Sequence, residues 1–104
     1  MEQQVIISPV VISKLKKLEL VLFKKEYFGF LDSAEEYVHK IFDTIYSIPT
    51  VKHHKTKTKK AGAFFVRHKP NSQTIYYITF DIKDNRYLVK DIFTNHEKRY
   101  KTWV

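Results

Sequence analysis

The spacing of the apolar residues changes at Pro49, and this change limits the chain to a few kinds of fold. Before Pro49, two segments carry apolar residues at steps of three and four, which is the period of an amphipathic helix. After Pro49 the period falls to two, which is typical of strands. We therefore expect an α+β fold, in which a helical layer covers one face of a small, twisted, mainly antiparallel sheet.

The N-terminal half predicts one strand followed by two helices. Val5-Ile6-Ile7 is a β-branched run, and Ser8-Pro9 supplies an N-cap and a proline at the first helical position. The first helix is expected to continue to about Phe28, just before Gly29. Its apolar stripe consists of Val11, Leu15, Leu18 and Leu22.

The second helix is expected to begin at Asp32-Ser33, where Ser33-x-x-Glu36 has the spacing of a capping box, and to end at Pro49. A short connection containing Gly29 makes the two helices an antiparallel hairpin. The stripe of the second helix consists of Ala34, Val38, Ile41, Ile45 and Ile48.

The C-terminal half predicts three antiparallel strands, at 63–69, 74–82 and 87–93, separated by turn-forming residues. The order β-α-α-β-β-β accounts for residues 1–104 as a single domain. In the middle strand, alternation divides the side chains between two faces. Tyr76, Ile78, Phe80 and Ile82 are expected to face the helices, and Tyr77, Thr79 and Asp81 the opposite, working surface.

The positive charge is concentrated in the second half. The chain carries 19 Lys and Arg against 11 acidic residues, a net charge of +8. Residues 1–50 contribute six lysines and seven acids, so the surplus lies beyond residue 50, and no carboxylate occurs between Asp43 and Asp81. This stretch is either a polyanion-binding surface or a solvated basic loop.

Several classes of protein are excluded or disfavoured. No apolar run is long enough for a transmembrane helix, and the N-terminus has no basic region typical of a signal peptide. The chain has no cysteine, and its five histidines lack zinc-like spacing, so we expect no metal site and no cofactor. Cytoplasmic location is the default expectation.

The segment 55–59 alternates lysine and threonine. If it is extended, Lys55, Lys57 and Lys59 project to one side together with His53, about 6–7 Å apart, which is close to the phosphate repeat of a single strand. If it is not extended, only a diffuse basic patch remains.

The order of elements and several local sequences resemble the RelE/ParE superfamily of bacterial type II toxins. The resemblance covers essentially the whole chain. It rests on Val5-Ile6-Ile7-Ser8-Pro9, Ile48-Pro49, Gly62-Ala63-Phe64-Phe65-Val66-Arg67, Tyr76-Tyr77-Ile78-Thr79-Phe80-Asp81 and Leu88-Val89-Lys90-Asp91-Ile92-Phe93-Thr94-Asn95-His96.

The resemblance implies a toxin that a cognate antitoxin neutralises. Members of the superfamily commonly cleave mRNA in the ribosome, without a metal, whereas the ParE branch inhibits DNA gyrase. An inactive member that only binds an antitoxin or nucleic acid is a third possibility. The resemblance also allows operator DNA as a partner of the toxin–antitoxin complex, and it implies no membrane partner.

Metal-free RNA cleavage needs a base for the 2′-hydroxyl, cations for the phosphate and an acid for the leaving oxygen. With no carboxylate in the basic stretch, the base there must be lysine or histidine, and cationic neighbours make Lys57 a candidate. The resemblance places Arg67 at the scissile phosphate and His96 and Tyr100 as acids. Candidate RNA contacts are Lys55, Lys59, Lys60, Lys69 and Arg99.

Each of these residues also has a plainer interpretation. Arg67 could be a solvent-facing strand residue paired with an acid. His96 and Tyr100 could belong to a polar tail whose aromatic residue packs on the sheet edge.

Overall fold

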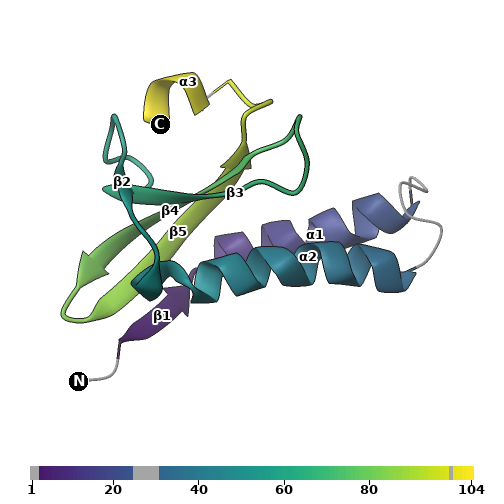
Figure 1. Ribbon diagram of the computed structural model, residues 1–104, viewed down its shortest axis with the longest axis horizontal. Helices are drawn as coiled ribbons and strands as arrows, with labels where there is room; N and C mark the ends of the chain where they lie inside the picture. The colour runs from purple at the N-terminus through teal and green to yellow at the C-terminus, as the bar shows by residue number, and fades with distance from the viewer. Residues whose placement is uncertain (1–2, 25–30, 99) are drawn as a thin grey trace.

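The computed structural model describes residues 3–24, 31–98 and 100–104, except for the side chains of 23 and 31–33 (Figure 1). Figure 1 shows three layers, with α1 and α2 on one side of the sheet and the short α3 on the other. The elements in chain order are β1 (Gln4–Ile7), α1 (Pro9–Lys24), α2 (Leu31–Tyr46), the 3₁₀ helix η1 (Ile48–Thr50), β2 (His54–Lys55), β3 (Phe64–His68), β4 (Tyr76–Lys83), β5 (Arg86–Thr94) and α3 (Tyr100–Trp103). The predicted α+β class is confirmed.

Helix α1 begins where the sequence predicts. The Ser8 hydroxyl accepts a hydrogen bond from the Val11 N–H at 3.3 Å, and Pro9 occupies the first helical position, where it gives up no intrahelical bond. Val11 and Leu15 are fully or almost fully buried, and Leu18 packs against the same core. The predicted end of this helix near Phe28, and Gly29, lie outside the described residues.

Helix α2 carries the predicted stripe as far as Ile45, because Ala34, Val38, Ile41 and Ile45 are at most 3% exposed. The helix ends at Tyr46, before the predicted Pro49, so the last stripe residue, Ile48, is fully buried in η1 instead. The predicted cap is wrong, however, since α2 begins at Leu31 and Ser33 therefore lies in its first turn. Leu31 precedes Ala34 by three residues, so the longer helix extends the same 3/4 spacing.

The sheet has the strand order β1-β5-β4-β3-β2. β1 pairs with β5 in parallel, and the other neighbours are antiparallel. Asp84 and Asn85, with positive φ values of 50° and 64°, form the tight turn between β4 and β5. The two-residue β2 is an additional edge strand that the sequence did not predict.

The two faces of β4 both become buried, in different ways. Tyr76, Ile78 and Phe80 join the core beneath α1 and α2 as predicted, but Ile82, near the hairpin end of the strand, is 40% exposed. On the other face, the prediction of an open surface is wrong for Tyr77 and Thr79, which are 7% and 0% exposed. The C-terminal segment with α3 packs there, in a second cluster that comprises Phe65, Tyr77 and Phe93 with Ile75, Tyr100, Trp103 and Val104 around them.

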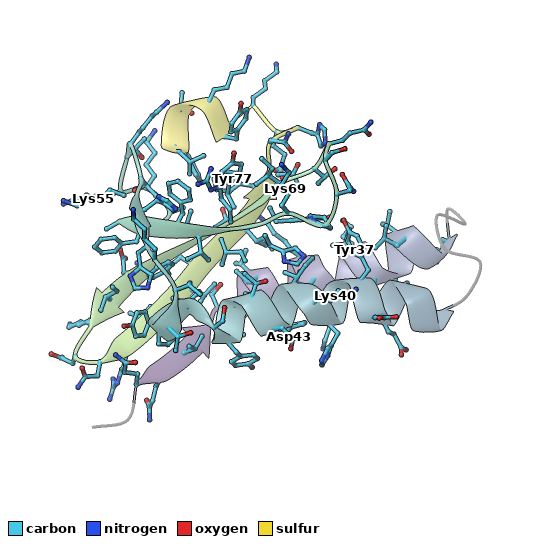
Figure 2. The ribbon with its side chains drawn as sticks, viewed as in Figure 1. Tyr37, Lys40, Asp43, Lys55, Lys69 and Tyr77 are labelled. Atoms are coloured by element: carbon cyan, nitrogen blue, oxygen red, sulfur yellow. The ribbon has the colours of Figure 1, made fainter. Side chains whose placement is uncertain are left out.

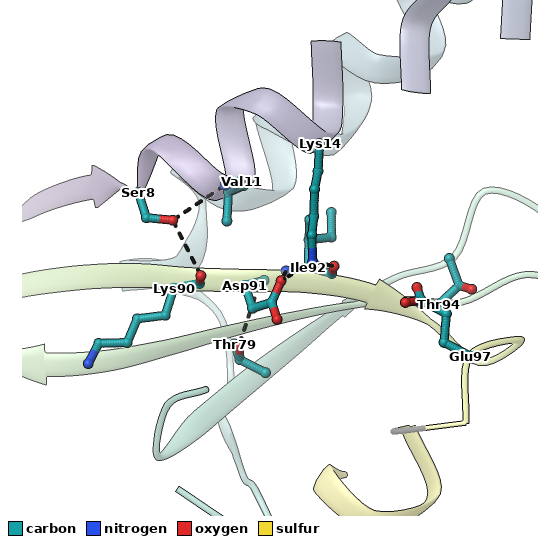
Figure 3. Close-up of polar contacts among 9 residues, drawn as sticks. All are labelled: Ser8, Val11, Lys14, Thr79, Lys90, Asp91, Ile92, Thr94 and Glu97. Carbon is teal, nitrogen blue, oxygen red and sulfur yellow. Dashed lines mark hydrogen bonds and ion pairs between the residues drawn. The ribbon is translucent and has the colours of Figure 1, made fainter. Parts of the chain in front are cut away.

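An ion pair joins the helical layer to the sheet. Lys14 Nζ lies 2.5 Å from Asp91 Oδ1 and also donates to the Ile92 carbonyl oxygen at 3.4 Å (Figure 3). Near it, the Ser8 hydroxyl donates to the Lys90 carbonyl oxygen at 3.3 Å. These contacts fix α1 against β5. None of the helices in the described ranges is long and apolar enough to cross a membrane.

Candidate functional site

Arg67 lies on the sheet face that α3 covers, toward the β2 edge. Along β3, Phe65 and Arg67 share this face because side chains alternate. Arg67 is exposed, and its Nη2 lies 3.5 Å from Nε2 of His54 on the neighbouring strand β2. The His54 ring stacks on Phe65, with the ring centres 5.2 Å apart. β3 and β2 therefore hold a guanidinium and an imidazole side by side.

The contact with Arg67 limits how His54 can take part in it. A guanidinium has only N–H donors, so any hydrogen bond across this 3.5 Å contact has the Nε2 of His54 as its acceptor. An imidazole nitrogen beside a guanidinium is suited to accept a proton once an anion binds the guanidinium.

Two tyrosines adjoin Arg67 on this face. Arg67 is opposite Tyr77 in the β3–β4 register, and the ring of Tyr100 stacks on that of Tyr77 with centres 5.6 Å apart and planes 17° apart. Burial raises the pKa of the Tyr77 phenol, and Tyr100 adds to the rise while the Arg67 cation opposes it. Tyr77 thus remains protonated at neutral pH, and α3 brings the predicted acid Tyr100 next to it.

Lys57 holds the C-terminal segment on this face. Its N–H donates to the Trp103 carbonyl oxygen at 2.8 Å, and its Nζ donates to the Lys101 carbonyl oxygen at 3.2 Å. Through these contacts Lys57 has a structural role, because it holds α3 on the sheet face that carries Arg67. Its role as a base stays a prediction.

The row of aligned lysines expected for an extended 55–59 segment does not form. Only His54 and Lys55 are in a strand, and the chain then bends through Lys57 to Ala61. Thr56 closes the loop, because its hydroxyl donates to the Gly62 carbonyl oxygen at 2.7 Å and its N–H to the Ala63 carbonyl oxygen at 3.1 Å. Lys55, opposite Phe64, points to the helical side of the sheet with His53, whereas Lys57 reaches α3 on the other side. The basic residues form a patch divided between two faces.

Asp81 offsets part of the positive charge at this end of the sheet. Its carboxylate accepts from the Ala63 N–H at 2.7 Å and pairs with Lys90 at 2.9 Å. Burial alone would raise the pKa of Asp81, but these two hydrogen bonds and the charges of Lys90 and Lys59 lower it below its ordinary value. Lys59 therefore lies near a carboxylate and is a weaker candidate for RNA contact than the sequence implied. The Lys60 N–H bonds to Thr58 within the same loop.

The remaining predicted residues lie toward the other end of β3. His96 is exposed in the loop after β5, with Nε2 3.2 Å from the Thr74 hydroxyl. Lys69 is exposed directly after β3, and Figure 2 shows Lys55 and Lys69 projecting at different parts of the sheet. Arg99 lies outside the described residues. The fold thus brings Arg67, Tyr100 and Lys57 to one face, with His96 and Lys69 at its end.

Among the described residues, no carboxylate forms an ion pair with Arg67. Arg67 is therefore not half of a surface ion pair with any acidic residue that the structure describes. No group of three His, Asp or Glu side chains in the described part of the chain is placed to hold a metal ion.

Sequence reasoning misses His54. In the sequence it is one of five histidines without zinc-like spacing, and its pairing with Phe65 joins segments separated by a loop. The only other sequence signal is its place in the basic stretch, where any base must be lysine or histidine.

No protein-family model matches the chain, and no curated protein or solved structure is significantly similar to it.

Proposed function

We propose that this protein is the toxin of a type II toxin–antitoxin system and acts as a metal-independent endoribonuclease on mRNA at the ribosome. The observation that carries the proposal is the contact of Arg67 with His54 on the sheet face where Tyr100 stacks on the buried Tyr77. Support also comes from the α+β architecture, in which one strand, two helices and a run of antiparallel strands follow one another as the resemblance leads us to expect, with β2 and α3 in addition. The proposal implies a cytoplasmic protein with an antitoxin as its protein partner.

The geometry suggests how the residues divide the reaction. The Arg67 guanidinium offers parallel N–H donors to the oxygens of the scissile phosphate. As a phosphate takes over these donors, the Nε2 of His54 loses its contact and is free to accept the proton of the 2′-hydroxyl.

The 2′-oxygen then attacks phosphorus, and the bond to the 5′-oxygen breaks. Tyr100 is the acid that protonates this leaving oxygen, with His96 as the alternative donor. The products are a 2′,3′-cyclic phosphate and a 5′-hydroxyl end, so atoms and charges balance without a metal.

The decisive experiment compares cleavage of mRNA by wild type, Arg67→Ala, His54→Gln and Tyr100→Phe in the presence of ribosomes and EDTA. Loss of an acid or base is expected to lower the single-turnover rate roughly 10²–10⁴-fold. Arg86→Ala is the matched control, because Arg86 is an exposed arginine of β5 opposite Gln4 of the β1 edge. Its rate should stay close to that of wild type.

Four results would overturn the proposal. Equal cleavage by wild type and all three site variants would reject this site, and 3′-hydroxyl products would reject the chemistry. Inhibition of gyrase supercoiling by a protein that leaves mRNA intact would assign it to the ParE-like alternative. RNA binding with a salt slope of roughly −0.7 per phosphate contact but no cleavage would mark an inactive member.

A further inference from the structure

β1 forms one edge of the sheet, and its outer side carries no partner strand among the described residues. The Gln4 N–H donates to the Asn85 carbonyl oxygen and the Ser8 N–H to the Val89 carbonyl oxygen, each at 3.0 Å. Because inward and outward backbone groups alternate along a strand, Val5 and Ile7 direct their N–H and C=O groups away from β5. This edge is a template for one more strand.

A groove runs beside this edge on the helical side. Its volume is about 480 Å³, and it is open to solvent. Its lining is mainly apolar and passes from the end of β1 to the first two turns of α1, with a single cation at one end. The lining residues are Ile7, Pro9, Ile12, Ser13 and Lys16. Side chains of an added strand that point to the helical side would enter this groove.

Two exposed cations lie beside the edge. Lys16 lines the groove and is exposed, and Arg86 is exposed opposite Gln4 at the start of β1. Neither residue takes part in an ion pair with a described residue. A second copy of the chain, with its net charge of +8, would place the same cations against one another if the two edges paired. Charge complementarity favours an acidic occupant instead.

We propose that the β1 edge and its groove bind an extended, acidic segment of a partner protein as an added strand. The backbone groups of Val5 and Ile7 supply the main-chain hydrogen bonds, and the groove takes an apolar side chain of the segment. Lys16 pairs with a carboxylate of the segment. The surface does not include Arg67, so this proposal stands apart from the one on RNA cleavage.

The test uses a synthetic ten-residue peptide that alternates valine with threonine or glutamate and carries a fluorophore at one end. Its binding is followed by fluorescence anisotropy, and a second peptide with lysine in place of each glutamate is the charge control. Amide hydrogen exchange of the full chain, with and without the acidic peptide, reports on the edge itself. We expect the Val5 and Ile7 amides to become protected.

Two variants and a matched control locate the site. Lys16→Glu should weaken binding of the acidic peptide about three- to tenfold, since it replaces an attraction by a repulsion at an exposed position. Ser13→Trp should abolish binding by filling the groove from an exposed position. Lys24→Glu makes the same charge change about 12 Å further along α1 and should leave the affinity within about twofold of wild type. Circular dichroism confirms that each variant is folded.

The proposal is overturned if the acidic peptide does not bind, or if it binds without protecting the Val5 and Ile7 amides. Equal effects of Lys16→Glu and Lys24→Glu, or tighter binding of the lysine peptide, would also refute it. A dimer of the chain alone in sedimentation, with these amides protected, would assign the edge to a second copy and refute the acidic occupant.

Discussion

The ion pair between Lys14 and Asp91 predicts that removing its two partners has unequal effects on stability. Asp91 lies in β5 with its side chain 12% exposed, whereas the Lys14 side chain on α1 is 38% exposed. The carboxylate also accepts from the Ile92 N–H at 2.8 Å (Figure 3). Lys14→Met therefore leaves a nearly buried anion without its cation, and Asp91→Asn leaves a half-exposed ammonium that water can reach.

The exposed fractions of the two side chains determine how much stability each variant should lose. Breaking a fully buried pair by removing one partner costs about 3–5 kcal/mol. Because Lys14 is more than a third exposed, solvent screens the pair, and we expect Lys14→Met to cost about 2 kcal/mol. The Asp91→Asn variant keeps a side-chain oxygen for the Ile92 N–H, so it should cost about 1 kcal/mol or less. The double variant should cost less than the sum, since Lys14→Met no longer leaves a charge behind.

Urea unfolding of the two single variants, the double variant and wild type measures these free energies, and m-values check that unfolding remains two-state. Lys16→Met is the matched control, because Lys16 is an exposed lysine of the same helix with no described ion pair, and it should change the free energy by less than about 0.5 kcal/mol. A larger loss for Asp91→Asn than for Lys14→Met, or strictly additive losses, would refute the argument from unequal burial.

Two further predictions concern the β3 region. Gly62 has φ +137°, and a Cβ there would lie 2.8 Å from the backbone N and O of Phe80, so Gly62→Ala should cost more than about 2 kcal/mol in thermal unfolding. Lys60→Ala in the same loop should cost less than about 0.5 kcal/mol, and similar melting of both variants would contradict the close approach. Burial and the charge of Lys40 lower the pKa of His68 from its ordinary value of 6.5. The unfolded chain therefore binds more protons below about pH 6.5, and the folded state loses stability as pH falls through that value toward the lowered pKa. His68→Gln should lose less stability than wild type between pH 7.5 and 5.5 in urea unfolding; equal losses would show that His68 does not contribute.

The helical layer is largely predictable, because the spacing of apolar residues within each helix determines which side chains are buried. Val11 and Leu15 on α1, and Ile41 and Ile45 on α2, are buried as the 3/4 spacing requires. The predicted start of α2 is wrong, since Ser33 satisfies a local capping pattern while the helix begins at Leu31. Local sequence signals do not determine the first residue of a helix to better than one or two positions.

The candidate site is predictable only in part, because it depends on contacts between residues that are far apart in the sequence. The sequence points to Arg67 and Tyr100, but the closeness of Arg67 to His54 depends on the pairing of β2 with β3 across a loop. The packing of Tyr100 on Tyr77 likewise depends on where the C-terminal segment folds back. Neither contact leaves a periodic trace in the sequence, which is why the expectation of an open surface around Tyr77 is wrong.

The strand order separates the two proposed surfaces. β1 and β3 have β5 and β4 between them, which at about 4.8 Å per strand amounts to about 14 Å. A strand added at β1 would extend the sheet on the side away from Arg67 and His54, and would leave the cation and imidazole accessible. A partner that both anchors at β1 and stops RNA cleavage must therefore also reach the face covered by α3, where the described contacts of Lys57 with Trp103 and Lys101 hold the C-terminal segment. It follows that Lys16→Glu should weaken the anchor without changing the cleavage rate of the protein alone, whereas Arg67→Ala should abolish cleavage and leave the affinity for the acidic peptide unchanged.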